Sequence, residues 1–511
     1  MKRYMTYLLP LCAALFAGNG CSDDTIYEAA NKGGVFPDYG QVLAFPGAEG
    51  FGRFATGGRG GEIVHVTNLN ASGEGSFADA VSKPNRVVLF DVAGVIDLNK
   101  GAVVLKSNQT ILFQTAPGDG VVLYNGRVSS SGASNLIVRY MRIRTGRQVG
   151  GSDNMDAGGL SSGEHVIYDH CSFTWGTDEN FSINADNKGT RPRNITIQNS
   201  IIGQGCMNHS AGGLIQTNTD EGVTIFRNLL IDNGTRNFKI KGLNQYVNNV
   251  IYNWGNGGAY IMGGDSSGES LTDIQNNYFI TGPCWTWRNT GLDDIKEKYP
   301  DTWEQVIADT ENCTVATEGK YYELRRQEGA AAPFSRGNDG FKTWCVGNYY
   351  DRNKNGSLDG EEITRTNFEA LNGWDGPTFL DARPEEHPVI GVMTSAAEAY
   401  EWVVANVGAS LPRRDKVDAY MIEELASLGT KGTILRDQTD PKHYPLADTW
   451  QQMDTANNKP LDTDHDGMPD AFEDANGLDK NDPSDAAKIA NNGYMNLENY
   501  IFTLENTTNN Q

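Results

Sequence analysis

The sequence Ile195-Thr196-Ile197-Gln198-Asn199 recurs in altered form along the middle of the chain, and this recurrence decides the fold. Each copy alternates apolar with polar residues and closes on a polar position. The closing positions lie roughly 20 to 30 residues apart, which is the spacing of stacked repeat architectures. They are Tyr140, His170, Asn199, Asn228, Asn249 and Asn277.

Repeats this short cannot bury an apolar face alone, so neighbouring copies must stack into one continuous core. The four closing asparagines predict an inward ladder in which side-chain amides hydrogen-bond from one coil to the next. We therefore predict an all-β fold, a right-handed parallel β-helix. Evenly spaced strands would also suit a β-sandwich, but a ladder of asparagines in register favours the β-helix.

The ends of the chain and its later part differ from the repeats. Residues 1–20 resemble an export signal, with Lys2 and Arg3 before an apolar stretch too short to span a bilayer. We expect a linker at 21–42, the β-helix at 43–282 and an inserted loop region at 283–388. A C-terminal extension with helices follows at 389–511, and the stretch from Ala396 to Leu428 has helical periodicity.

Cys21 follows a stretch that resembles a loose bacterial lipobox, and the acidic Ser22-Asp23-Asp24 comes next. This pattern predicts a secreted protein, held by a lipid on Cys21 at the outer-membrane surface of a bacterium. A simple cleaved signal with an incidental cysteine is the alternative. Of the later cysteines, Cys284, Cys313 and Cys345 lie in the insertion, where a disulfide between two of them is plausible.

The chain has 511 residues and a formal net charge of −23. This charge argues against nucleic acid as a partner, because nucleic-acid-binding proteins present basic surfaces. It also disfavours acidic polymers in general, unless cations or a local basic patch bridge the two. We expect a monomer.

Two twelve-residue stretches match the EF-hand calcium loop, which places oxygen ligands at alternate positions, glycine at position six and glutamate at position twelve. We assign both loops to Ca²⁺ and to a stabilising role. The first supplies Asp351, Asn353, Asn355, Ser357, Asp359 and Glu362. The second supplies Asp462, Asp464, Asp466, Met468 (through its carbonyl), Asp470 and Glu473.

A second group of charged residues lies on the repeats. Asp156 and Asp178 are one coil apart, on the side from which Arg236 and Lys241 are expected to project. Carboxylates beside a cationic strip are suited to calcium that bridges the protein to an acidic sugar. Surface ion pairs, each of little energetic value, are the alternative for this group.

The order of several motifs resembles that of the pectate lyases of polysaccharide lyase family 1, and more narrowly the members with calcium loops found in gut Bacteroidetes. The motifs are Phe45-Pro-Gly-Ala-Glu-Gly-Phe-Gly52, Tyr168-Asp169-His170, Trp175-Gly-Thr-Asp-Glu-Asn180 and Arg236 to Gly242. The resemblance implies a parallel β-helix that cleaves polygalacturonate by β-elimination. In that reaction Ca²⁺ binds the uronate carboxylate and acidifies the C5 proton, and the products carry 4,5-unsaturated ends.

Carried over by position, the resemblance makes Asp156 and Asp178 acidic calcium ligands, with Ser182 as a neutral oxygen nearby. Arg236 matches the catalytic arginine and Lys241 a substrate-supporting arginine. Lys239 and His209 are candidates for substrate binding, although His209 could equally be an ordinary turn residue. A free guanidinium essentially never loses its proton, so Arg236 serves either as a base in a special environment or as a stabiliser of the developing enolate.

Three features depart from the family pattern. Phe238 stands where proline is usual, Asn154 and Ser182 stand where further acids occur, and no lysine falls around Gly205 to Met207. Neutral oxygens at Asn154 and Ser182 predict a calcium that binds weakly or only together with substrate.

Three other functions are alternatives for this sequence. A polygalacturonase needs two acids flanking the bond. Asp178 and Glu179 are adjacent, so on a strand they should point to opposite faces, and this pair cannot serve. A pectin lyase would not need the acidic pair. A non-catalytic glycan-binding lipoprotein could use Trp285 and Trp287 as a stacking platform.

Overall fold

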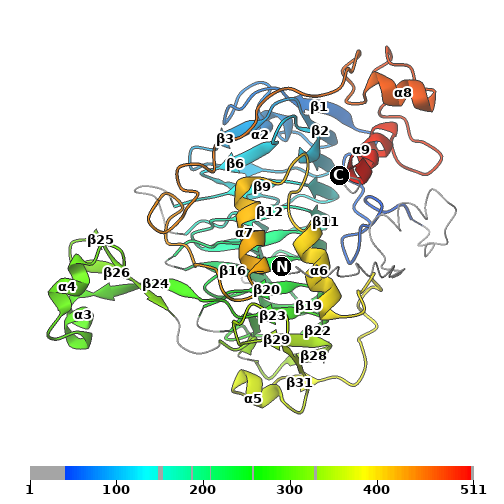
Figure 1. Ribbon diagram of the computed structural model, residues 1–511. Coiled ribbons are helices and arrows are strands. Elements are labelled where there is room, and N and C mark those ends of the chain that lie inside the picture. The colour runs from blue at the N-terminus through cyan, green and yellow to red at the C-terminus, as the bar shows by residue number, and fades with distance from the viewer. Residues whose placement is uncertain are drawn as a thin grey trace, which may run out of the picture.

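The computed structural model describes residues 41–147, 154–185, 188–207, 209–255, 258–326, 331–335 and 337–507. Most of the strands stack in parallel, one coil above the next, and form a parallel β-helix with three faces (Figure 1). The chain runs from the blue coils at one end to the green and yellow coils at the other. The predicted fold class is confirmed.

Face A carries the repeats that decided the fold. Its strands are β1 (Glu62–Val66), β2 (Arg86–Phe90), β5 (Gln109–Leu112), β8 (Leu136–Arg139), β11 (Gly163–Asp169), β14 (Pro192–Gln198), β17 (Val223–Phe226), the second half of β19 (Lys239–Val247), β22 (Ser270–Gln275), β28 (Phe341–Val346) and β31 (Thr378–Phe379). Tyr168, Ile197 and Ile225 lie in register on successive coils. All three are buried in the central core, as the alternating pattern requires.

Face B is built from shorter strands. They are β3 (Gly94–Asp97), β6 (Val121–Tyr124), β9 (Arg142–Arg144), β12 (Ser172–Thr174), β15 (Ile201–Gly203), β18 (Leu229–Ile231), β20 (Val250–Tyr252), β23 (Tyr278–Ile280) and β29 (Asn348–Asp351), with β30 (Glu361–Ile363) added antiparallel. Helices α6 (Ala396–Asn406) and α7 (Lys416–Ala426) lie along the stack in Figure 1 and pack their apolar side chains against this face.

Face C holds the strands β4 (Ala102–Val104), β7 (Arg127–Ser129), β10 (Gly158–Leu160), β13 (Glu179–Asn184), β16 (Ala211–Gln216), the first half of β19, β21 (Tyr260–Met262) and β27 (Phe334–Ser335). β19 is long enough to pair on both faces, with β16 and β21 on face C and with β17 and β22 on face A. The second group of charged residues in the sequence analysis, which comprises Asp156, Asp178, Arg236 and Lys241, lies on or beside face C.

The asparagine ladder exists, but it is shifted from the predicted one. The Oδ1 atom of Asn249 accepts hydrogen bonds from Asn228 on the previous coil, and Asn249 donates in turn to Asn277. Asn277 donates to Asn348, which continues the ladder beyond its expected end. The prediction for Asn199 was wrong, because Ser200 occupies the ladder position on that coil and accepts from the backbone of Cys171.

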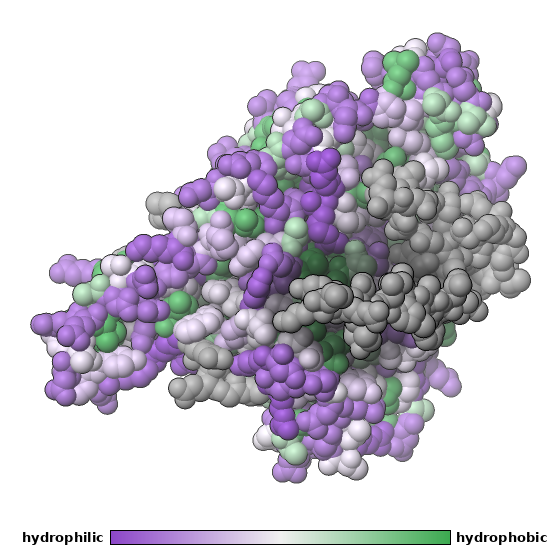
Figure 2. Space-filling model, viewed as in Figure 1, coloured by the Kyte–Doolittle hydropathy of each residue, from purple (hydrophilic) through white to green (hydrophobic). Residues whose placement is uncertain are grey.

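The excursion from the stack is shorter than the predicted 283–388. It forms an arm that stands away from the β-helix in Figure 1, made of β24 (Trp285–Gly291), α3 (Leu292–Lys298), α4 (Trp303–Ala308), β25 (Cys313–Thr317) and β26 (Lys320–Arg326). After the arm the chain returns to the stack as β27, β28, β29 and β31, with α5 (Phe368–Asn372) between them. Figure 2 shows that the visible surface of the arm is largely hydrophilic.

The remaining elements lie at the N-terminal end of the β-helix. α2 (Phe77–Ala80) and the 3-10 turn Phe113–Thr115 belong to its first coils, and α8 (Asp470–Asn476) and α9 (Asn496–Thr507) lie beside β1 and β2 (Figure 1). None of the helices in the described ranges is long and apolar enough to cross a membrane.

No disulfide joins any of the five cysteines in the described part of the chain, so the pairing considered among Cys284, Cys313 and Cys345 is absent there. Cys171 and Cys206 are buried, as small apolar residues often are.

Candidate active site

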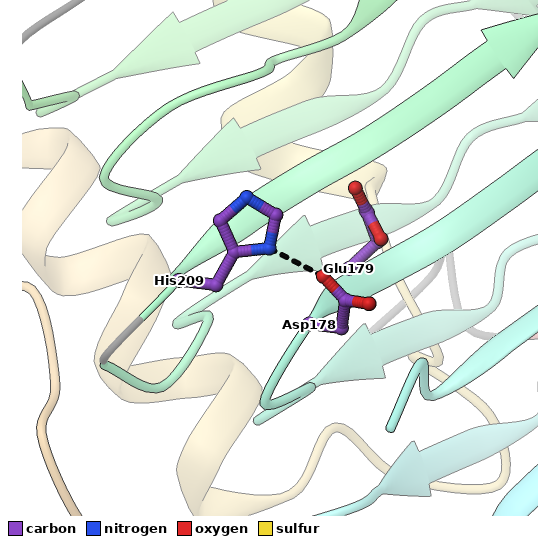
Figure 3. A group of neighbouring side chains, drawn as sticks. All are labelled: Asp178, Glu179 and His209. Carbon is purple, nitrogen blue, oxygen red and sulfur yellow. Dashed lines mark hydrogen bonds and ion pairs between the residues drawn. The ribbon is translucent and has the colours of Figure 1, made fainter. Parts of the chain in front are cut away.

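Asp178, Glu179 and His209 bring one ligand atom each to within 4.8 Å of one another on the outside of face C (Figure 3). Asp178 lies in the turn before β13, Glu179 is the first residue of β13, and His209 precedes β16 on the next coil. The Nδ1 atom of His209 and the Oδ1 atom of Asp178 share a short hydrogen bond. Glu179 is buried, whereas the other two side chains are about one-third exposed.

Glu179 is the functional candidate that the sequence reasoning missed. Neighbouring residues on a strand point to opposite faces, and this rule predicts that the carboxylates of Asp178 and Glu179 diverge. It fails here because Asp178 belongs to the turn, so its carboxylate converges with that of Glu179 in Figure 3. The geometric argument against a two-carboxylate hydrolase therefore does not hold.

Asp156 completes the acidic group from the preceding coil. Its Oδ1 atom accepts a hydrogen bond of 3.2 Å from the backbone N–H of Glu179. The Oγ atom of Ser182 is buried and has no hydrogen-bond partner. These residues line a cavity of about 360 Å³ together with Asp178 and two cationic side chains, Arg127 and Lys188.

The carboxyl groups disturb one another's titration. Burial, followed by the charges of Asp156 and Asp178, raises the pKa of Glu179 to about 7. Burial also raises the pKa of Asp156, whereas the hydrogen bond from His209 lowers that of Asp178. Crowded carboxylates with a spare buried hydroxyl are a donor set suited to a hard cation such as Ca²⁺.

The structure brings Arg236 to the acidic group. Its Nη1 atom donates to Oε1 of Glu179 in a close ion pair, and about one-quarter of its side chain is exposed. Arg236 lies in the loop between β18 and β19. The arginine thus points out of the β-helix, toward the carboxylates.

The two lysines lie two residues apart on β19, and the buried Ile240 separates them. Lys239 lies in register with Leu214, which in turn lies in register with Ser182, and it forms an ion pair with the exposed Asp265. Lys241 is buried, and its Nζ atom donates to the carbonyl of Ser267 at 3.0 Å. Lys239 therefore lies in the same row of face C as Ser182 of the acidic group, while Lys241 is held in place by Ser267.

The first predicted calcium loop does not gather its acids. The amide groups of Asn353 and Asn355 donate to Asp359. Glu362 lies exposed on β30, where it pairs with Tyr349 on β29. Within the described ranges, no trio of His, Cys, Asp or Glu side chains converges at this loop. Its calcium remains a prediction for Asp351, Asn353, Asn355, Ser357, Asp359 and Glu362.

The second loop does gather its acids. Asp462, Asp464 and Asp466 converge, and Asp466 also meets Glu473. Asp470 differs, because its carboxylate accepts from the backbone N–H and the hydroxyl of Thr463.

The tryptophans of the arm do not form a stacking platform. Trp287 is fully buried against His443 and Arg436, and only Trp285 is exposed.

Comparison with known proteins identifies the family of this chain. No protein-family model matches it. A probable pectate lyase C of Aspergillus flavus is 42% identical over 459 residues, covering 89% of this chain and 93% of the relative. A probable pectate lyase C of Neosartorya fischeri is 42% identical over 469 residues, covering 91% and 95%. The chain belongs to the pectate lyase family.

Solved structures of pectate lyases resemble the chain more distantly. The thermostable pectate lyase PL 47 is 14% identical, with a TM-score of 0.45, over 73% of this chain and 99% of that one. The pectate lyase Bsp165PelA from Bacillus sp. N165, in complex with trigalacturonate, is 14% identical, with a TM-score of 0.42, over 70% and 98%. It is membership of the pectate lyase family, rather than carboxylate geometry, that decides for a polysaccharide lyase over a hydrolase.

The pectate lyase relatives also correct the predicted location. They are proteins of Aspergillus flavus, Neosartorya fischeri and similar fungi, which have no bacterial outer membrane. The assignment to an outer-membrane lipoprotein of a bacterium is therefore wrong. Cys21 and the rest of the predicted signal and lipobox lie outside the described residues.

Proposed function

We propose that this protein is a pectate lyase that cleaves polygalacturonate by calcium-assisted β-elimination at the acidic group of face C. The observation that carries the proposal is the ion pair between Arg236 and Glu179, which places a cationic side chain beside clustered carboxylates in a protein of the pectate lyase family. An acidic group alone would repel a uronate polymer, and an arginine alone would not hold a metal.

Asp156, Asp178, Glu179 and the hydroxyl of Ser182 are the residues that would hold Ca²⁺ there. Bound Ca²⁺ supplies Lewis-acid chemistry, in that it neutralises the uronate carboxylate and makes the adjacent C–H more acidic. The close approach of Asp156, Asp178 and Glu179 supports this set, because burial and mutual repulsion disfavour the charged forms of Asp156 and Glu179. Two positive charges would relieve that repulsion.

Arg236 has the catalytic role in this proposal. Its guanidinium is held in place by Glu179 and partly exposed, so it can contact the uronate where negative charge develops at C5 and the carboxylate. Lys239 lies in the same row of face C as Ser182, and its ammonium group is suited to pair with the carboxylate of a neighbouring uronate. His209 is oriented by Asp178, and its other ring nitrogen can accept a hydrogen bond from a sugar hydroxyl. Lys241, anchored on Ser267, supports the substrate-facing edge of β19.

The deciding experiment follows ultraviolet absorbance of unsaturated uronate when the purified chain acts on polygalacturonate at alkaline pH. We expect absorbance to rise with Ca²⁺ and to stop with chelator. Reducing ends without absorbance would indicate a hydrolase. Binding without either product would indicate a glycan receptor, and a rise that needs methylated polymer but no Ca²⁺ would indicate a pectin lyase.

A further inference from the structure

Three buried acids form a second cluster, which lies in the C-terminal part of the chain. Asp466 comes from the loop before α8, Glu473 from α8 and Asp485 from the segment after it. One carboxylate oxygen of each lies within 4.8 Å of the others. Asp466 also belongs to a converging trio with Asp462 and Asp464, so five carboxylates surround one region.

The carboxylates of this cluster lack the partners that buried acids require. Glu473 is fully buried, and neither of its oxygens has a hydrogen-bond partner. Asp466 and Asp485 are 2% and 3% exposed, and each has one oxygen without a partner. No lysine, arginine or histidine in the described part of the chain forms an ion pair with any of the three. Leaving buried charge unpaired is costly, so the cluster must either take up protons or bind a cation, and its unpartnered oxygens are suited to a cation.

We propose that Asp462, Asp464, Asp466, Glu473 and Asp485 bind one hard divalent cation of the calcium class, and that this ion fastens the C-terminal segment to the first coils of the β-helix. An all-oxygen set of this size suits calcium rather than softer metals, which prefer sulfur or imidazole. The carboxylates of the proposed set depart from the EF-hand frame at two places, and the Met468 carbonyl stays a predicted ligand beside them. Asp470 is turned toward Thr463, and Asp485, which lies beyond the twelve-residue loop, closes the site.

The loop is packed directly against face A. The side chain of Met468 is fully buried in a cluster with Val87, Leu89 and Leu112 of strands β2 and β5. A side chain at Gly467 would place its Cβ 2.3 Å from Leu89, so glycine allows this close approach. A cation that orders the loop therefore also orders the contact of Met468 with the first coils.

The same segment is linked to the β-helix by ion pairs from α9. Glu498 accepts two hydrogen bonds from Arg59, at 2.8 and 3.0 Å. Glu505 pairs with the buried Arg139 of β8. Leu497 and Ile501 of α9 belong to the same apolar cluster as Met468. The proposed ion, the apolar cluster around Met468 and the ion pairs of α9 thus together attach the C-terminal segment to the first coils of the β-helix.

The test compares Asp485→Asn with Asp470→Asn in the full chain. Both variants, and the parent protein they are compared with, carry Asp178→Asn to weaken the proposed calcium site on face C. CaCl₂ is added to chelator-treated protein, and the melting temperature is measured. We expect Ca²⁺ to raise the melting temperature of the parent and of Asp470→Asn by about 3 °C or more. Asp485→Asn should lose most of that shift, yet melt in chelator at or above the parent temperature, because one repelling charge is gone.

Limited proteolysis supplies the second measurement. Ca²⁺ should protect the segment around 462–485 from cleavage in the parent and in Asp470→Asn, but not in Asp485→Asn. The proposal is overturned if Asp485→Asn keeps the full calcium shift, or if Asp470→Asn loses it. Lyase activity of the single Asp485→Asn variant at saturating Ca²⁺ separates the two proposals. If the Asp485→Asn substitution removes the calcium-induced rise in melting temperature but the single variant keeps its activity, the result supports the cation site and leaves the proposed function untouched. If the protein without substitutions is inactive but the parent keeps the rise, the proposed function fails and the cation site stands.

Discussion

Arg236 donates to Glu179 across one coil of the β-helix, and this pair links the loop before β19 to the acidic group at the start of β13. Glu179 is therefore shared between a cation of the protein and two neighbouring carboxylates. The pair makes the position of the arginine depend on the state of the acids beside it.

Replacing Arg236 by alanine should abolish the production of unsaturated uronate. The side chain is partly exposed, and the buried Glu179 can take up a proton when its partner is lost, because burial and the neighbouring acids already raise its pKa to about 7. The melting temperature near neutral pH should therefore change little. Arg191→Ala is the matched control, since Arg191 is more than half exposed and pairs with Asp220 and Glu221 away from the acidic group. A variant of Arg236 that keeps most of its activity would refute the catalytic role.

Glu179→Gln should lower activity at limiting Ca²⁺ by about 10-fold or more, because it removes one candidate ligand and loosens Arg236. Part of the loss should be recovered at high Ca²⁺, which distinguishes weakened metal binding from general damage. The variant should also melt no lower than the parent in chelator, since a repelling buried charge has been removed. Activity with an unchanged calcium dependence would show that Glu179 is not a ligand.

A buried acid pair at the contact of α7 with face B predicts a pH-dependent stability. Burial raises the pKa of Asp232 to about 7, and burial together with Asp232 raises that of Glu424. A carboxyl whose folded pKa exceeds its unfolded pKa binds more protons when folded, so stability falls as pH rises from about 4 through about 7. Tyr420, Tyr252 and Asn253 face the pair and supply no positive charge.

Asp232→Asn should therefore raise the melting temperature at about pH 8 and change it little at about pH 4.5. Asn253 donates to Oδ1 of Asp232 at 2.5 Å, and an amide oxygen can accept the same bond. Asp375→Asn, at an exposed position, serves as control. An equal effect at both pH values would contradict the assigned protonation.

Asn249→Ala should destabilise the β-helix strongly. Oδ1 of Asn249 accepts from the backbone and the side chain of Asn228, at 3.0 and 3.1 Å. Each buried group left unpaired costs about 1–3 kcal/mol, so the free energy of unfolding should fall by at least that amount. Asn491→Ala, on the exposed surface, should leave denaturant unfolding unchanged. A ladder variant as stable as this control would mean that the hydrogen bonds contribute little.

Periodicity sufficed to predict the β-helix, because stacking leaves few alternatives for short alternating repeats. It could not place every residue on the ladder. Asn199 takes a left-handed conformation (φ 55°), and the next residue, Ser200, points inward instead. Asn199 and Ser200 are both polar and both follow the apolar strand residues, so the sequence pattern cannot tell which of them occupies the ladder position.

The candidate site was predicted in part for a similar reason. Asp156, Asp178 and Arg236 follow from motif order, whereas Glu179 depends on where a turn ends and a strand begins. Asp485 reaches its cluster only because the segment after α8 folds back, and no spacing rule links it to the loop. The repeat spacing predicts contacts between successive coils. It does not predict contacts that depend on how the turns and the non-repeating segments fold.

The thiol state of the described cysteines has a practical consequence for handling the protein. Burial raises the pKa of the Cys284 and Cys345 thiols to about 12, which suppresses the thiolate forms that react with oxidants. With no sulfur bridge among the described residues to form or break, the fold does not depend on a redox environment. Mature protein made in the reducing cytosol of a production host, and purified under reductant, should therefore have the same melting temperature as protein made under oxidising conditions.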